Sequence, residues 1–128
     1  MSDKILTLKS LEGTYCVLRL SKDEPFPPWI NHEAFFSITK TFDELSIVCL
    51  EQNIPEDIPR EGGFEILKVE GPLDFSLTGV IAGISGVLAQ NGISLFTVST
   101  FDTDYILIRA EAMASAKLAL TQANYEIR

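Results

Sequence analysis

The sequence predicts an α+β protein, because short alternating segments typical of strands are interspersed with two segments that have helical periodicity. Hydrophobic residues make up 46% and charged residues 22% of the 128-residue chain, and both are ordinary values for a globular protein. This length suits one compact domain, or two half-sized modules that share a core. We therefore expect a folded chain without widely separated domains.

Strands are expected where side chains alternate and where Ile, Val, Phe or Tyr are abundant. Five segments meet this description: 14–20, 45–50, 64–69, 93–99 and 105–109. Three weaker candidates are a strand at 34–38, an edge strand at 5–8 and a closing strand at 125–127.

Helices are predicted over residues 77–91 and 111–123. In the first, apolar residues recur at steps of three and four positions, at Leu77, Val80, Ile81, Ile84, Val87 and Leu88. Asp74 or Ser76 is placed to accept hydrogen bonds from its first N–H groups, and Gly92 follows its end. The second is rich in alanine and stops at Asn124.

A connector is expected at residues 53–63, which combine prolines, glycines and charges. We place a boundary near Arg60, giving an N-terminal module 1–60 and a C-terminal module 61–128. The second module has the order βαββαβ, which predicts a ferredoxin-like antiparallel sheet with helices on one face. The first resembles a degenerate copy of that plan, with a short helical turn after Pro25, Pro27 and Pro28.

Charge and cysteine content exclude several functional classes. A net charge of −8 argues against nucleic acid as a partner, since binding there needs a basic surface. No apolar run is long enough to span a membrane, and residues 1–4 lack the apolar core of a signal peptide, so we expect a cytoplasmic protein. Cys16 and Cys49 have no metal-binding or redox spacing, so we interpret them as buried free thiols.

The segment Gly71-Pro-Leu-Asp-Phe-Ser-Leu-Thr-Gly-Val80 and the following Ile93-Ser-Leu-Phe-Thr-Val-Ser-Thr100 resemble the ACT domain. They are most similar to the ACT domains of aspartokinase regulatory regions and of the animal cytosolic arginine sensors. The next segment, Phe101-Asp-Thr-Asp-Tyr-Ile-Leu-Ile108, resembles a hairpin of those sensors and of small bacterial ACT proteins. The first half matches more loosely, through Glu44-Leu-Ser-Ile-Val48.

The resemblance implies a regulatory protein that binds an amino acid or a similar metabolite at the seam between ACT modules. It also implies a regulated protein partner, without catalysis, and we expect no cofactor. Exposed sheet edges and small-residue helix faces need covering, so we expect a homodimer. The implied ligand-binding residues lie at the helix start, at the hairpin and on a strand of the first module: Asp74, Ser76, Leu77, Gly79, Val80, Thr100, Phe101, Asp104, Ser46 and Ile47.

These residue types suit an amino acid, which carries one group of each charge. Free N–H groups and the dipole at a helix start favour the ligand carboxylate, and Gly79 allows close approach to the backbone. Asp74 and Asp104 are suited to an ammonium or guanidinium group. Asp74 serves equally well as a helix cap, whereas Asp102 fits better as a turn residue.

Other candidate residues favour structural roles. His32 has no catalytic partner near it in the sequence, and the aromatic group Phe26, Trp29, Phe35 and Phe36 indicates core or a pocket wall. Gly83 and Gly86 indicate a helix interface or simply weak helix positions. No metal cluster, nucleophile motif or phosphate loop is present in the sequence, so we expect no catalytic residues. The alternative to a sensor is a structural or partner-binding module with no small-molecule ligand.

Overall fold

The structure is a computed structural model and describes residues 6–71 and 78–128. The chain divides into two compact units, unit 1 (Met1–Glu12 and Glu65–Arg128) and unit 2 (Gly13–Phe64). The sequence-based boundary near Arg60 placed residues 1–12 with the N-terminal half. Instead, strand β1 (Thr7–Ser10) pairs antiparallel with the second part of β5 (Arg60–Val69), within unit 1.

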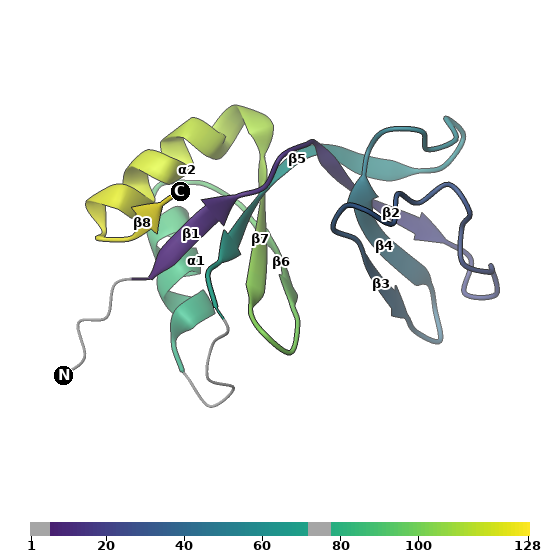
Figure 1. Ribbon diagram of the computed structural model, residues 1–128, viewed down its shortest axis with the longest axis horizontal. Coiled ribbons are helices and arrows are strands. Elements are labelled where there is room, and N and C mark those ends of the chain that lie inside the picture. The colour runs from purple at the N-terminus through teal and green to yellow at the C-terminus, as the bar shows by residue number, and fades with distance from the viewer. Residues whose placement is uncertain (1–5, 72–77) are drawn as a thin grey trace. The chain divides into compact units, whose positions relative to one another are not determined.

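Unit 1 has the predicted βαββαβ order (Figure 1): β5, α1 (Val80–Gln90), β6 (Phe96–Ser99), β7 (Asp104–Arg109), α2 (Ala110–Gln122) and β8 (Glu126–Ile127). Its strands lie in the order β6-β7-β5-β1-β8. The additional strand β1 was expected at an edge, but it lies between β5 and β8. It runs parallel to β8, so this sheet is mixed and not wholly antiparallel.

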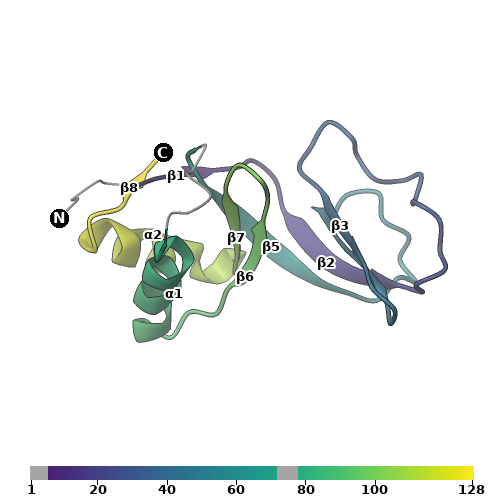
Figure 2. The same cartoon turned by 90° about the horizontal axis from the view of Figure 1, so that it is seen from below.

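The core of unit 1 forms where both helices pack on the same face of its sheet (Figure 2). Periodicity explains this burial, because apolar positions spaced by three and four residues share one side of a helix. Among the fully buried side chains are Leu8, Leu67, Ile84, Leu88, Ile106, Ile108 and Leu120. Gly92 and Asn124, which follow the two helices, have φ angles of 69° and 73°, the left-handed conformation common after a helix end.

Unit 2 is an antiparallel sheet formed by β3 (Ser37–Lys40), β4 (Leu45–Leu50), β2 (Tyr15–Leu20) and the first part of β5, in that order. The expected helical turn after the prolines is absent, since residues 21–36 contain turns and bends but no helix. Proline lacks an N–H group, and the aromatic side chains of this segment pack on one another instead. Helices therefore cover the sheet of unit 1 but not the described sheet of unit 2.

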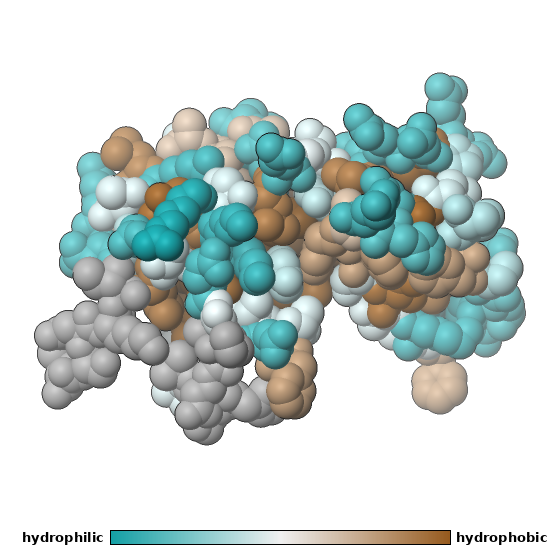
Figure 3. Space-filling model, in the orientation of Figure 1, coloured by the Kyte–Doolittle hydropathy of each residue, from teal (hydrophilic) through white to brown (hydrophobic). Residues whose placement is uncertain are grey.

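Hydrophilic residues cover much of the visible surface of each unit (Figure 3). Two large apolar side chains of the described chain depart most from this distribution, Phe42 at 94% exposed and Phe101 at 85% exposed. Phe42 lies in the turn between β3 and β4, and Phe101 lies in the turn between β6 and β7. Neither side chain therefore contributes to the core of its unit.

The two cysteines face one another in unit 2. Cys16 and Cys49 are opposite each other in the β2–β4 register, and both are buried free thiols, as predicted. A hydrogen bond with Cys49, together with burial, raises the pKa of Cys16 above its ordinary value. The Cys16 thiol therefore stays neutral near physiological pH, and the pair contributes to the apolar core.

Strand β5 contains a β-bulge just before it leaves unit 2. Tyr15 pairs with Phe64, but Val17 pairs with Glu61, so β5 contains one more residue than β2 between these positions. Gly63 has a φ of 76°, and its N–H donates to a carboxylate oxygen of Glu51 at 2.9 Å. A Cβ on Gly62 would lie only 2.2 Å from the other Glu51 oxygen, so both bulge positions favour glycine.

We expect Gly63→Ala to lower the free energy of unfolding by about 1–2 kcal/mol, because a Cβ is strained at this positive φ. Gly86→Ala is the matched control, since a Cβ there meets nothing within 4 Å and Gly86 lies inside helix α1. The control should raise stability by about 0.5–1 kcal/mol. Urea unfolding followed by circular dichroism measures both changes, and equal effects at the two sites would contradict the proposed strain.

Candidate functional site

The turn between β6 and β7 is fixed by hydrogen bonds of two threonines, Thr100 and Thr103. The Thr100 backbone N–H donates to the carbonyl of Thr103 at 2.8 Å, and the Thr100 hydroxyl donates to the same carbonyl at 3.1 Å. The hydroxyl of Thr103, a buried polar residue, donates to the Val69 carbonyl at 2.5 Å. This last bond attaches the turn to the end of β5, so the hairpin has a defined position in unit 1.

Asp104 begins β7 directly opposite Ser99 of β6. The Ser99 hydroxyl donates to one Asp104 carboxylate oxygen at 2.5 Å. Asp104 is half-buried, and an ionised carboxylate accepts several hydrogen bonds, so its second oxygen can still receive a donor. The hairpin thus presents a carboxylate whose orientation is set by a neighbouring strand.

Among the residues that the structure describes, no side chain caps the N-terminus of helix α1. Its N-cap is Gly79, with a φ of 81°, and no acidic residue lies in the first turn. The first N–H groups of a helix have no partner within the helix, and they carry a partial positive charge. In both views the start of α1 and the β6–β7 turn lie at the same end of unit 1 (Figures 1 and 2).

The structure places the predicted ligand-binding residues in three groups. Gly79 and Val80 lie at the start of α1, and Thr100, Phe101 and Asp104 lie at the β6–β7 hairpin, all in unit 1. Ser46 and Ile47 are on β4 in unit 2. The remaining three, Asp74, Ser76 and Leu77, lie outside the described residues.

The exposure of each side chain decides whether that residue can contact a ligand through its side chain or only through its backbone. Val80 and Ile47 are buried in the cores of their units, so any ligand contact that they make is through backbone groups. Phe101 is largely exposed at the hairpin turn, and Ser46 is half-buried. Phe101 therefore offers an apolar surface that the core of unit 1 does not use.

Two residues of this region do not emerge from the sequence as site residues. The sequence indicates Thr103 only as part of a tight turn and Ser99 only as a strand residue. A hairpin with its turn at residues 100–103 puts positions 99 and 104 opposite each other. The Ser99–Asp104 contact could therefore have been predicted from the position of the turn. The bond from Thr103 to Val69 spans 34 positions and has no local signature.

Neither helix of the described chain is long and apolar enough to cross a membrane. Within residues 6–71 and 78–128, no group of three or more His, Cys, Asp or Glu side chains is arranged to hold a metal ion. The chemistry available at this end of unit 1 includes hydrogen bonding by the first N–H groups of α1 and charge pairing by the Asp104 carboxylate.

Comparison with protein families finds two matches along the chain. The ACT domain family model matches residues 60–122. A second family model, for an N-terminal domain, matches residues 13–57. No curated protein matches the chain.

Solved structures similar to this chain include a protein of Agrobacterium tumefaciens with 39% identity and a TM-score of 0.90, over 98% of this chain and 93% of that one. A Vibrio cholerae protein of unknown function, described as a possible transport protein, is 17% identical, with a TM-score of 0.70 over 91% of this chain and 88% of that one. The aspartate kinase of Clostridium acetobutylicum, described as an allosteric enzyme, is 11% identical, with a TM-score of 0.62, and the match covers 88% of this chain and 33% of the kinase. The last two show similarity of fold alone.

We expect Thr103→Val to lower the free energy of unfolding by about 1–3 kcal/mol, because it keeps the side-chain shape but leaves the Val69 carbonyl without its hydroxyl donor. Thr97→Val, at an exposed position of β6, is the control and should change stability by less than about 0.5 kcal/mol. Urea unfolding measures both. A Thr103 variant as stable as the control would show that the bond to Val69 does not fix the turn.

Proposed function

Because this chain belongs to the ACT domain family through residues 60–122, we propose that it is a regulatory protein that binds an amino acid or a closely related metabolite. The proposed ligand lies at a seam of the ACT module, at the end of unit 1 that holds the start of α1 and the β6–β7 turn. The protein binds without catalysing a reaction, and its output is a change in the surface that it presents to a regulated partner.

The observation that carries this proposal is the presence of complementary charges at one end of unit 1. Helix α1 has no acidic residue in its first turn, and no side chain of the described residues caps it, so its first N–H groups suit a ligand carboxylate. The Asp104 carboxylate, oriented by Ser99, suits the ligand ammonium. An amino acid carries both groups on one carbon, so a small molecule can satisfy both partners.

The resemblance to ACT domains extends the proposed site to Thr100, Phe101 and Val80 in unit 1. Thr100 holds the turn through its contacts with Thr103, and exposed Phe101 supplies an apolar surface for a ligand side chain. Asp74, Ser76, Leu77, Ser46 and Ile47 remain predictions from the resemblance. The identity of the ligand side chain depends on these flanking positions.

We also propose a homodimer, with β6 as the pairing edge. β6 pairs with β7, and among the described residues it has no second strand neighbour. Thr100 and Thr103 form a hydrogen-bonded pair, and in an antiparallel ladder hydrogen-bonded and non-hydrogen-bonded pairs alternate. Thr97 is three positions before Thr100, so it belongs to a non-hydrogen-bonded pair, and its N–H and C=O groups point away from β7. An unpaired edge bearing Phe96, which is 39% exposed, suits a second copy of the same strand.

Isothermal titration against the twenty amino acids should find at least one that binds. Asp104→Asn should weaken this binding by about 10- to 100-fold, because it removes the charge that pairs with the ligand ammonium. Asp102→Asn, two residues away in the exposed turn, is the matched control and should bind as tightly as the unmodified protein.

If no amino acid binds, the sensor proposal fails and a partner-binding module without a small-molecule ligand becomes the better interpretation. The same conclusion follows if Asp104→Asn changes stability alone. Exposed Phe101 would then be the first residue to test for a protein contact.

Light scattering should give the mass of a dimer for the unmodified chain and of a monomer for Thr97→Pro. Proline removes an N–H that points outward from β6, so the β6–β7 pairing is kept while the free edge is blocked. Thr97→Val is the control and should remain dimeric. A dimer that survives Thr97→Pro would place the interface elsewhere.

A further inference from the structure

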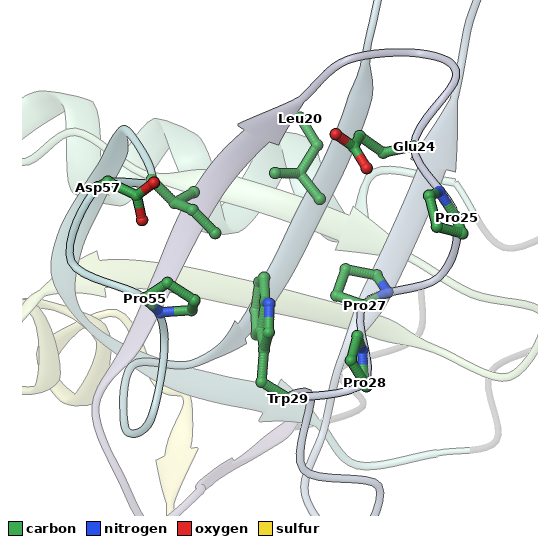
Figure 4. A pocket seen from close by; sticks show the side chains of 9 residues that line it. Leu20, Glu24, Pro25, Pro27, Pro28, Trp29, Pro55 and Asp57 are labelled. Carbon is green, nitrogen blue, oxygen red and sulfur yellow. The ribbon is translucent and has the colours of Figure 1, made fainter.

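Unit 2 contains a hollow that plays no part in the proposed amino-acid site. It has a volume of about 350 Å³ and lies between the proline-rich loop after β2 and the loop after β4 (Figure 4). Nine residues line it: Leu20, Glu24, Pro25, Pro27, Pro28, Trp29, Pro55, Asp57 and Ile58. Figure 4 shows the Trp29 indole between Pro55 and Pro27, with Glu24 and Asp57 on opposite sides. Its size falls within the range of small-molecule pockets.

The wall formed by the proline-rich loop is held in place by packing. Trp29 packs against the core of unit 2, and the next residue, Ile30, is buried in that core. On the same loop, the ring of Phe26 lies 5.3 Å from His32 and 5.8 Å from Phe36. Prolines fix their own φ angles, so little conformational entropy remains to be lost when this wall binds a ligand.

The opposite wall is held by Arg60 and by the core. The Arg60 guanidinium donates to the carbonyls of Ile58 and Pro55, and the Ile58 N–H donates to the Pro55 carbonyl at 3.2 Å. Ile54, next to Pro55, is buried. Both walls therefore exist before any ligand arrives.

The charges around the hollow are negative. Glu24 and Asp57 are exposed, and neither forms an ion pair within the described part of the chain. Arg60, the basic residue that contacts this wall, has its guanidinium on backbone carbonyls. The Trp29 indole adds an electron-rich face, which attracts a cation within about 6 Å of the ring centre.

We propose that this hollow binds a small organic cation, of the class in which an alkylated or quaternary ammonium group is attached to a short apolar chain. The ammonium contacts the face of Trp29 and is neutralised by Glu24 and Asp57, while the prolines and Leu20 contact its methyl groups. An inorganic cation would make no use of the apolar walls, and a neutral solute would gain nothing from the two carboxylates.

Trp29 is the only tryptophan of the chain, so its fluorescence reports on the hollow directly. Titration with choline should change the emission of Trp29 in a saturable way at roughly millimolar concentration. The neutral isostere 3,3-dimethylbutan-1-ol, and sodium chloride at equal ionic strength, should give no saturable change. A response to choline no larger than the response to the neutral isostere would overturn the proposal.

Variants locate the binding, with calorimetry as the readout that does not depend on tryptophan. Glu24→Gln combined with Asp57→Asn should weaken choline binding about fivefold or more, and Trp29→Leu about threefold to fivefold. Glu56→Gln removes an exposed charge beside Asp57 that does not line the hollow, and it should leave binding unchanged. Equal losses in all three variants would overturn the assignment to this hollow.

Two further measurements test whether the losses of affinity come from the hollow itself. Circular dichroism of each variant should match the unmodified protein, and Trp29→Phe, which keeps an aromatic face, should restore most of the affinity lost in Trp29→Leu. Binding of a lysine-rich peptide far more tightly than choline would overturn the small-molecule assignment in favour of a protein partner. Because the hollow lies within unit 2, Asp104→Asn should not change choline binding, whether or not the amino-acid proposal holds.

Discussion

The contact between Glu51 and the bulge at Gly62–Gly63 is the constraint on which the path of β5 depends. β5 pairs with β2 in its first part and with β1 in its second, and it contains one extra residue close to where the first pairing ends. The backbone can accommodate this residue at Gly63 because a glycine adopts the positive φ without strain. The Glu51 carboxylate then accepts the N–H that the bulge turns away from the ladder.

The position of β1 follows from the same strand. The second part of β5 offers a free side to another strand, and β1 takes it, with Leu8 opposite Val69. β8 then pairs with β1, in parallel, and not with β5. The ferredoxin-like order is kept along the chain, but an additional strand is inserted into the sheet. Leu8 is fully buried in the same core as the helices, so its side chain helps to hold the short strand β1 in the sheet.

Elements with strong local signals were predictable from the sequence. The predicted segment 45–50 coincides with β4, and helix 111–123 differs from α2 by one residue at each end, because alternation and helical periodicity depend on the residues of the element itself. The helical turn expected after Pro25, Pro27 and Pro28 was a wrong prediction, since the aromatic packing in this segment involves residues that the local pattern does not pair. The central place of β1 was also missed, because pairing partners distant in sequence leave no periodic signal.

The two proposed sites also differ in whether local sequence signals or tertiary contacts form them. The proposed amino-acid site rests on backbone groups at the start of α1 and on one oriented carboxylate, and both were predicted from motif similarity in a contiguous stretch of sequence. The hollow in unit 2 joins Trp29 to Pro55 and Asp57, more than twenty positions further along the chain, through loops that lack regular structure. Such a site depends on how two loops pack against one core, so it emerges only once the core is known. Substitutions in that core should therefore affect the hollow more than they affect a site built on a helix end and a tight turn.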